Sequence, residues 1–259
     1  MTITVQGAPL MAYLLASVRI IAWLAVVPPF SSRSVPSMAK VVLALGLSFV
    51  VAPSLAQGRL PGSTPELLLV VLTQVVVGLG MGFVTMLLFS AVSTAGSLVD
   101  VFGGFALAAA FDPLAMNQTS VFGKWHQWLG TALLVVSGGH LVVIGGLLKT
   151  FSFLPLSGMP DLAGWQPVLV TAFGMFFTVA VQIALPLVAV LFLADLSLAL
   201  LTKVAPQLSA INIMYPAKIG LTLLLVGLSF PVLPHALDKL VDYSLQAMSA
   251  MSSAGPGSG

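Results

Sequence analysis

The sequence predicts an all-α protein of about six long apolar helices, arranged as hydrophobic helical hairpins. Only 6% of the 259 residues are charged and 59% are hydrophobic, whereas ordinary soluble domains carry about 25% charged residues. Such a chain lacks the polar groups that cover a water-facing surface, and it is too hydrophobic to be disordered. Several stretches without any charged residue approach or exceed the roughly 20 residues that a helix needs to cross a bilayer. We therefore expect a polytopic membrane protein or a subunit buried in a larger apolar assembly.

Uncharged runs and the Pro- and Gly-rich stretches between them locate the helices. The third helix is expected to begin at Thr64-Pro65-Glu66, because Pro suits the first helical position and Glu the first turn. The stretch 95–112 is a seventh apolar piece, but it is too rich in Gly and Ala, and too close to the third helix, to be expected as a span. The six expected helices cover about residues 10–28, 41–56, 66–92, 127–148, 167–193 and 217–234.

Composition also narrows the chemistry. The chain has no cysteine, and its three histidines and seven acids are scattered, so neither a metal site nor a cofactor is expected. Nine scattered Lys and Arg residues do not form a nucleic-acid-binding patch. The residues before the first apolar run carry no positive charge, so no cleavable signal peptide is expected.

No catalytic motif is present, so we expect no enzyme activity. Catalysis needs a nucleophile, a base and an orienting group within reach of one another, and the sequence has no Gly-x-Ser-x-Gly, His-Glu-x-x-His or Walker A pattern. Two alternatives stay open. One is a secondary transporter of a small solute, and the other is a lipid enzyme that uses His126 or His140.

Gly78 and Gly82 lie four residues apart in an apolar run. This spacing is typical of a small-residue surface that allows two helices to pack closely, and we interpret it in that way.

Arg19, Asp100 and Asp195 lie within or at the edges of apolar segments. Ions at such positions are costly and face protein or water. They are interpreted as salt bridges between subunits or helices, with a role in assembly, or as side chains that snorkel. An ion relay or a substrate contact is the alternative.

The most unusual stretch covers residues 102–122, which are apolar yet loop-like. Gly103 and Gly104 free the backbone at one end, and Asp112-Pro113 favours a turn. Phenylalanines recur through it, and so much aromatic surface would be unfavourable in water. Irregular backbone at membrane depth survives only where protein covers it or where it lines a cavity. The stretch is therefore expected either to pack in a core or to close a channel.

These residues resemble the FliR family of flagellar type III secretion export-gate subunits, which has a related injectisome counterpart. The resemblance runs from about residue 10 to residue 234 and rests on four landmarks. They are Val18-Arg19-Ile20 followed by Pro28 to Pro36 and Lys40; Gly104-Phe105 through Asp112-Pro113; Gly139-His140-Leu141; and Ala205-Pro206-Gln207-Leu208 with Pro216, Lys218 and Gly220. Ser137-Gly138 departs from the Asn-Gly that the family usually shows.

The resemblance implies a single domain over residues 1–259. About 10–160 would form a FliP-like part and about 161–240 a FliQ-like hairpin, and residues 244–259 are expected to be a disordered tail. With FliP-like and FliQ-like subunits, such a protein forms a channel for unfolded flagellar proteins in the basal body of the bacterial inner membrane. FlhB-like and FlhA-like export components are further implied partners.

The resemblance also implies that residues 105–122 plug the pore, with Gly103 and Gly104 as the hinge of the plug. The plug residues are Phe105, Leu107, Phe111, Asp112, Pro113, Met116 and Phe122.

Overall fold

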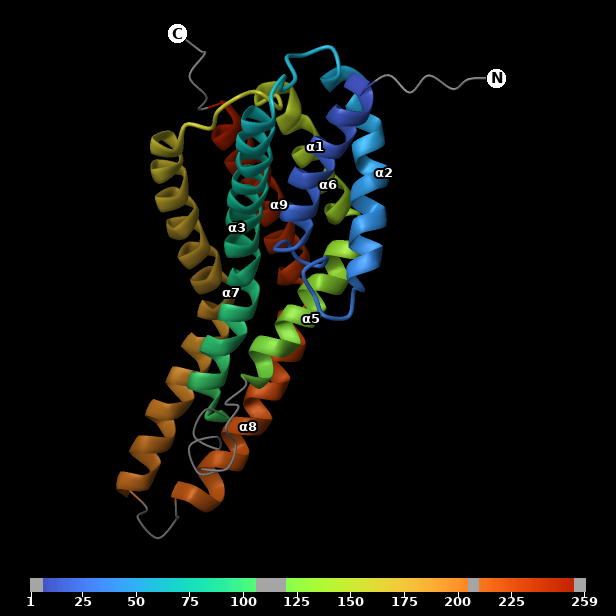
Figure 1. Ribbon diagram of the computed structural model, residues 1–259. Helices are drawn as coiled ribbons and strands as arrows, with labels where there is room; N and C mark the ends of the chain where they lie inside the picture. The colour runs from blue at the N-terminus through green and yellow to red at the C-terminus, as the bar shows by residue number, and fades with distance from the viewer. Residues whose placement is uncertain (1–6, 106–119, 205–209, 254–259) are drawn as a thin grey trace. The chain divides into compact units, whose positions relative to one another are not determined.

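The computed structural model describes residues 7–105, 120–204 and 210–253, and every regular element in these ranges is a helix (Figure 1). The all-α prediction is therefore confirmed. In chain order the helices are α1 (Gly7–Leu24), α2 (Ser37–Leu55), α3 (Thr64–Gly103), α5 (Val121–Val136), α6 (Gly139–Phe153), α7 (Leu162–Val204), α8 (Ala210–Ser229) and α9 (Val232–Ser253).

Within the described ranges, α1, α2, α3 and α7 are each long and apolar enough to cross a membrane. The helices α5 and α6 are long and apolar enough only when they are taken together as one bent span. The same holds for α8 from Pro216 taken together with α9. Counting each pair as one span gives six, which confirms the prediction of about six long apolar helices.

Two of the predicted helices are broken, and both breaks are explained by local chemistry. The segment 127–148 was expected to be one helix, but α5 and α6 meet at Ser137-Gly138 with a bend of 73°. Gly138 has a φ of 76°, which is readily available only to glycine. The segment 217–234 is divided in the same way, with a bend of 58° at Phe230-Pro231, where the proline ring and the missing N–H interrupt the helix.

Helix α3 begins at Thr64 as predicted. Ser63 Oγ accepts the N–H of Glu66 at 3.4 Å, and the Glu66 carboxylate accepts the N–H of Gly62 at 2.9 Å. These reciprocal bonds satisfy amides at the start of the helix. The helix then runs to Gly103, so the first part of the predicted seventh piece, residues 95–103, belongs to α3.

The chain divides into two compact units, and four helices contribute residues to both. Unit 1 contains residues 1–88, 135–174 and 240–259, and unit 2 contains residues 89–134 and 175–239. Because α3, α5, α7 and α9 are each divided between the units, the units do not follow the predicted division near residue 160. The predicted division separates a FliP-like part from a FliQ-like hairpin, and this resemblance stays a prediction.

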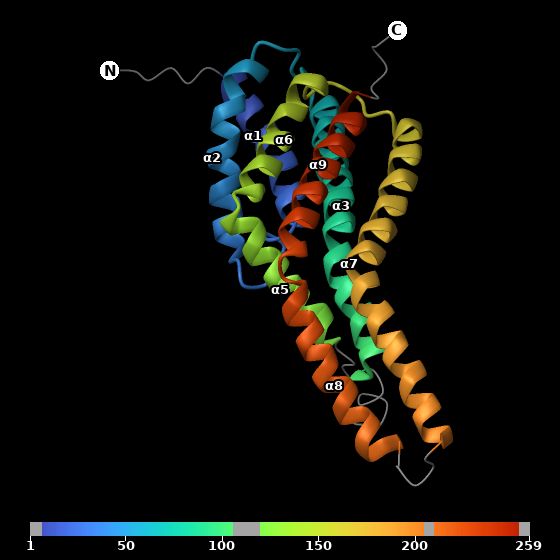
Figure 2. The ribbon, with the colours of Figure 1, turned by 180° about the vertical axis from the view of Figure 1, so that it is seen from behind.

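In unit 1, α1 lies beside α2 in both views (Figures 1 and 2). On α3, Gly78 and Gly82 face α1. A Cβ on Gly78 would clash with the carbonyl oxygen of Arg19, and a Cβ on Gly82 would lie 3.3 Å from the carbonyl oxygen of Trp23. The absence of side chains at these two positions therefore allows the backbones of α1 and α3 to approach closely.

The C-terminal part of the chain corrects one prediction. Residues 244–253 were expected to belong to a disordered tail, but they continue α9 with Met248 and Met251 buried. The indole N–H of Trp165 on α7 donates to the carbonyl oxygen of Met251 at 2.9 Å. The low hydrophobicity of this segment reflects an amphipathic helix rather than disorder. Residues 254–259 lie outside the described residues.

Candidate functional site

The candidate site in unit 2 lies at the end of α3 and the start of α5, on the two sides of residues 106–119. We call it the loop neck and define it as Asp100, Gly103, Gly104, Phe105, Ser120 and Phe122. Five of the predicted plug residues lie outside the described residues, namely Leu107, Phe111, Asp112, Pro113 and Met116. Of the seven predicted plug residues, the structure therefore describes the two at the ends, Phe105 and Phe122.

Two glycines shape the part of the loop neck that lies at the end of α3. A Cβ on Gly103 would lie 2.9 Å from Cγ2 and 3.0 Å from Oγ1 of Thr222, which is fully buried on α8. Gly104 follows with a φ of 86°, a conformation that side-chain-bearing residues rarely adopt. The end of α3 thus packs tightly on α8 and the chain turns sharply. Hinge motion at this pair stays a prediction.

The aromatic rings at the two ends of the neck touch each other. Phe105 and Phe122 pack edge to face, with ring centroids 4.9 Å apart and ring planes at 80°. Phe122 belongs to a buried cluster with Val99, Leu187, Leu191 and Val226, and Phe105 packs against that cluster. The two ends are therefore held together by apolar contacts.

Polar contacts fix the part of the loop neck that lies at the start of α5. Asp100 is 4% exposed, and both of its carboxylate oxygens lie 3.1 Å from the backbone nitrogen of Phe122. Ser120 donates a short hydrogen bond to the same carboxylate and accepts the N–H of Gly123 at 2.8 Å. The first turn of α5 is thus capped by its own serine and by an acid from α3, which places negative charge at the positive end of the helix.

A glycine allows this contact between helices. A Cβ on Gly96 of α3 would clash with the carbonyl group of Phe122, so the close approach of α3 and α5 requires glycine there. The contact of Asp100 with α5 was not predicted from the sequence. The one available signal was Ser120, a residue that favours the N-cap position, immediately before the apolar run of α5.

His126 is also buried in unit 2, on α5. Its Nδ1 lies 2.8 Å from the carbonyl oxygen of Phe122, so that nitrogen donates to the backbone of its own helix. Among the described residues, no group of three or more His, Cys, Asp or Glu side chains could hold a metal ion.

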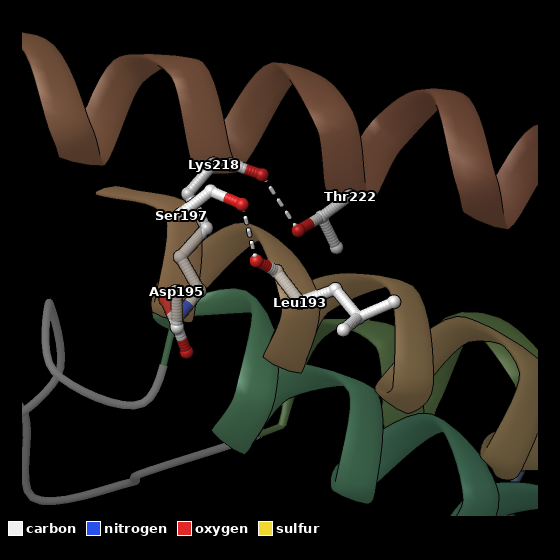
Figure 3. Close-up of polar contacts among 5 residues, drawn as sticks. All are labelled: Leu193, Asp195, Ser197, Lys218 and Thr222. Atoms are coloured by element: carbon white, nitrogen blue, oxygen red, sulfur yellow. Dashed lines mark hydrogen bonds and ion pairs between the residues drawn. The ribbon is translucent and has the colours of Figure 1, made fainter. Parts of the chain in front are cut away.

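Asp195 lies on α7, where it pairs with Lys218 of α8 (Figure 3). The lysine Nζ is 2.6 Å from Oδ1 and 2.7 Å from Oδ2. The side chain of Lys218 is 13% exposed and that of Asp195 is 36% exposed, so the pair is only partly screened by solvent. Neighbouring hydroxyls bond to the backbone of their own helices, Ser197 to Leu193 and Thr222 to Lys218, each at 2.8 Å.

Arg19 is fully buried in unit 1. Its Nε donates to Gln74 Oε1 at 2.7 Å, and its Nη2 donates to the carbonyl oxygen of Leu154 at 2.9 Å. Gln74 in turn donates to the carbonyl oxygen of Leu156 at 3.0 Å. Arg19 therefore ties α1 and α3 to the connection between α6 and α7. The assembly role predicted for Arg19, Asp100 and Asp195 stays a prediction.

The helices and these contacts define a class of protein: an all-helical membrane protein whose buried charges are held by partners within the chain. The chain belongs to the family described as "Bacterial export proteins, family 1", whose model matches residues 10–244.

Curated relatives agree with that membership. The flagellar biosynthetic protein FliR of Escherichia coli K12 is 31% identical over 222 residues, which cover 86% of this chain and 85% of the relative. FliR of Pectobacterium carotovorum is 28% identical and covers 91% of this chain and 92% of the relative. The secretion system apparatus protein SsaT of Salmonella typhimurium is 28% identical and covers 74% and 75%. The relatives thus include both flagellar and secretion-system proteins.

Proposed function

We propose that this chain is a non-catalytic subunit of a flagellar type III secretion export gate. In this proposal it forms a channel for unfolded flagellar proteins with FliP-like and FliQ-like subunits, next to FlhB-like and FlhA-like components, in the bacterial inner membrane. Support comes from the match over residues 10–244 and from the FliR relatives, which are named for flagellar biosynthesis.

The same proposal gives residues 105–122 the role of the plug that closes this channel. The observation that carries it is the contact between Phe105 and Phe122. The two ends meet in a buried apolar cluster, and in this proposal they form the fixed base of the plug. Closure is then steric and apolar, and the loop base need not move when the tip does.

A deletion tests this role. Residues 106–116 are removed in cells that carry the whole export apparatus, and assembly is confirmed by co-purification of the partner subunits. Each buried phenylalanine that closes the channel should contribute about 2 kcal/mol to the closed state through apolar burial. We therefore expect ion conductance through the membrane to rise while the complex still assembles.

A matched control is Phe49→Ala, since Phe49 lies on α2 with 76% of its surface exposed and outside the loop neck. It should leave conductance unchanged. Unchanged conductance after the deletion would show that the loop is only a packing element, whereas failure to co-purify with FliP-like and FliQ-like subunits would argue against the export-gate role itself.

A further inference from the structure

An open groove in unit 2 is lined by residues of α5 and of α8. Its volume is about 580 Å³, which lies in the range of about 300–1,000 Å³ that is typical of ligand sites. Phe122 of α5 and Val226 of α8 both line the groove and belong to one buried cluster. That cluster joins the two helices and fixes the shape of the groove.

The other walls of the groove are exposed and mostly apolar. Trp125 and Trp128 contribute from α5, and Leu223 and Phe230 contribute from the other side. Both walls belong to helices that are apolar and long enough to cross a membrane as parts of bent spans. An exposed apolar patch of this kind marks a site that contacts a membrane or another protein.

Lys124 is the one charged residue in the lining of the groove. Its side chain is exposed, and no ion pair within the described residues involves it. The acid that contacts the start of α5, Asp100, is buried and already accepts hydrogen bonds from Ser120 and Phe122. The groove therefore combines an apolar surface with a positive charge that has no counter-charge in the described part of the chain.

A phospholipid with a negatively charged headgroup matches this combination. Each CH₂ group of an acyl chain gains free energy when it is buried against an apolar wall, and the phosphate accepts hydrogen bonds from an ammonium group. Tryptophan rings favour the depth of the lipid headgroups, where the indole N–H can find an acceptor. An apolar helix could fill the groove but would leave Lys124 without a counter-charge. A second copy of the chain that met this groove with its own would bring two like charges together.

We propose that the groove between α5 and α8 binds an anionic phospholipid. An acyl chain lies along Trp125, Trp128 and Leu223, and the phosphate lies at Lys124. The lipid site adjoins the loop neck, because Ser120 belongs to the lining of both. This inference goes beyond the export-gate role and does not depend on the role of the plug.

Tryptophan fluorescence tests the proposal, because bromine on an acyl chain quenches an indole that it touches. The full-length protein is purified with its partner subunits and reconstituted into phosphatidylcholine vesicles. One set of vesicles contains a minor fraction of dibrominated phosphatidylglycerol, and the other contains the same fraction of dibrominated phosphatidylcholine. We expect stronger quenching by the phosphatidylglycerol. This excess should disappear when Trp125→Phe and Trp128→Phe are combined, which assigns it to the groove.

Two further variants test the shape and the charge of the groove. Nothing lies within 4 Å of the Cβ position of Gly227, so Gly227→Leu places a side chain in the groove and should abolish the excess quenching. Gly220→Leu is the matched control, because Gly220 has the same free space on α8 but does not line the groove. Lys124→Gln should weaken the preference for phosphatidylglycerol about fivefold, as expected for one lysine near an anionic membrane surface. Lys149→Gln, at an exposed lysine on α6, should leave it unchanged.

Equal quenching by the two brominated lipids would overturn the proposal. An excess that survives Gly227→Leu would also overturn it, since the lipid would then lie outside the groove. If neither lipid quenched Trp125 and Trp128, a partner protein would cover the groove, and the proposal would equally be wrong. None of these results measures export or co-purification, so each leaves the export-gate role untouched.

Discussion

Both carboxylate oxygens of Asp100 on α3 lie 3.1 Å from the backbone nitrogen of Phe122 on α5. The two residues are 22 positions apart in sequence, and the segment between them contains the predicted plug. This bond, the short hydrogen bond from Ser120 and the contact between Phe105 and Phe122 close the base of that segment. The loop neck is thus a specific set of contacts that can be tested one at a time.

Removal of the Asp100 carboxylate should destabilise the start of α5. Asp100→Ala leaves the Phe122 N–H and the Ser120 hydroxyl without their acceptor, which should cost about 1–3 kcal/mol. Asp100→Asn should cost less, because its amide oxygen still accepts. Thermal unfolding in detergent measures the effect, with Asp242→Asn on the exposed face of α9 as the control. Equal midpoints for Asp100→Ala and the control would contradict the cap.

The aromatic contact should show a measurable coupling. Phe105→Ala, Phe122→Ala and the double variant form a cycle in which the coupling energy is expected to be about 0.5–1.5 kcal/mol. The reason is that each single change removes the edge-to-face contact, so the second change loses less. Unfolding of the purified complex gives the three values. Strict additivity would mean that the rings do not support each other.

Bulky side chains at Gly103 and Gly104 should restrict the movement of the predicted plug. Valine at both Gly103 and Gly104 would clash with Thr222 at the first position and would strain a φ of 86° at the second. We expect slower export of flagellar subunits from cells in which assembly is verified. Gly46→Val is the control, since nothing lies within 4 Å of the Cβ position of Gly46. Normal export from the double valine variant would rule out a hinge.

The ion pair of Asp195 with Lys218 should serve structure rather than proton transfer. Asp195→Asn should impair assembly if it has any effect, because it leaves a partly buried lysine without its counter-charge. Exchange of the two residues, with Asp195→Lys and Lys218→Asp together, should restore part of the lost assembly. Co-purification and secretion are measured in the same cells. A block of export with normal assembly in Asp195→Asn would instead indicate a relay role.

Close packing of α3 on α1 should not tolerate a side chain at Gly78. Gly78→Leu would meet the backbone of Arg19 and the side chain of Ala22, and overpacking of this kind costs about 1–3 kcal/mol or more. Gly174→Leu is the matched control, because its Cβ position has open space in the chain. Protein yield and unfolding midpoint should fall for Gly78→Leu. Equal behaviour of the two variants would contradict the role of Gly78.

The sequence allowed the helical segments to be predicted well because burial in an apolar environment requires long uncharged helices. The start of α3 was also predictable, since Ser63 and Glu66 bond to amides within four residues of themselves. The bends at Gly138 and Pro231 were not predicted, although both residues were visible, because hydrophobicity alone does not distinguish one long helix from two joined at an angle.

By itself, therefore, the sequence determined the class of protein, the approximate extent of its helices and the resemblance to export-gate subunits. These follow from composition, from local backbone chemistry and from residue order. Only the tertiary structure decided that Asp100 caps α5, that Asp195 pairs with Lys218 and that Gly78 lies against Arg19. Such pairings depend on which helix faces pack together, and many arrangements of apolar helices bury similar areas. Hydrogen bonds, ion pairs and close glycine contacts distinguish among those arrangements through directional contacts between residues far apart in sequence.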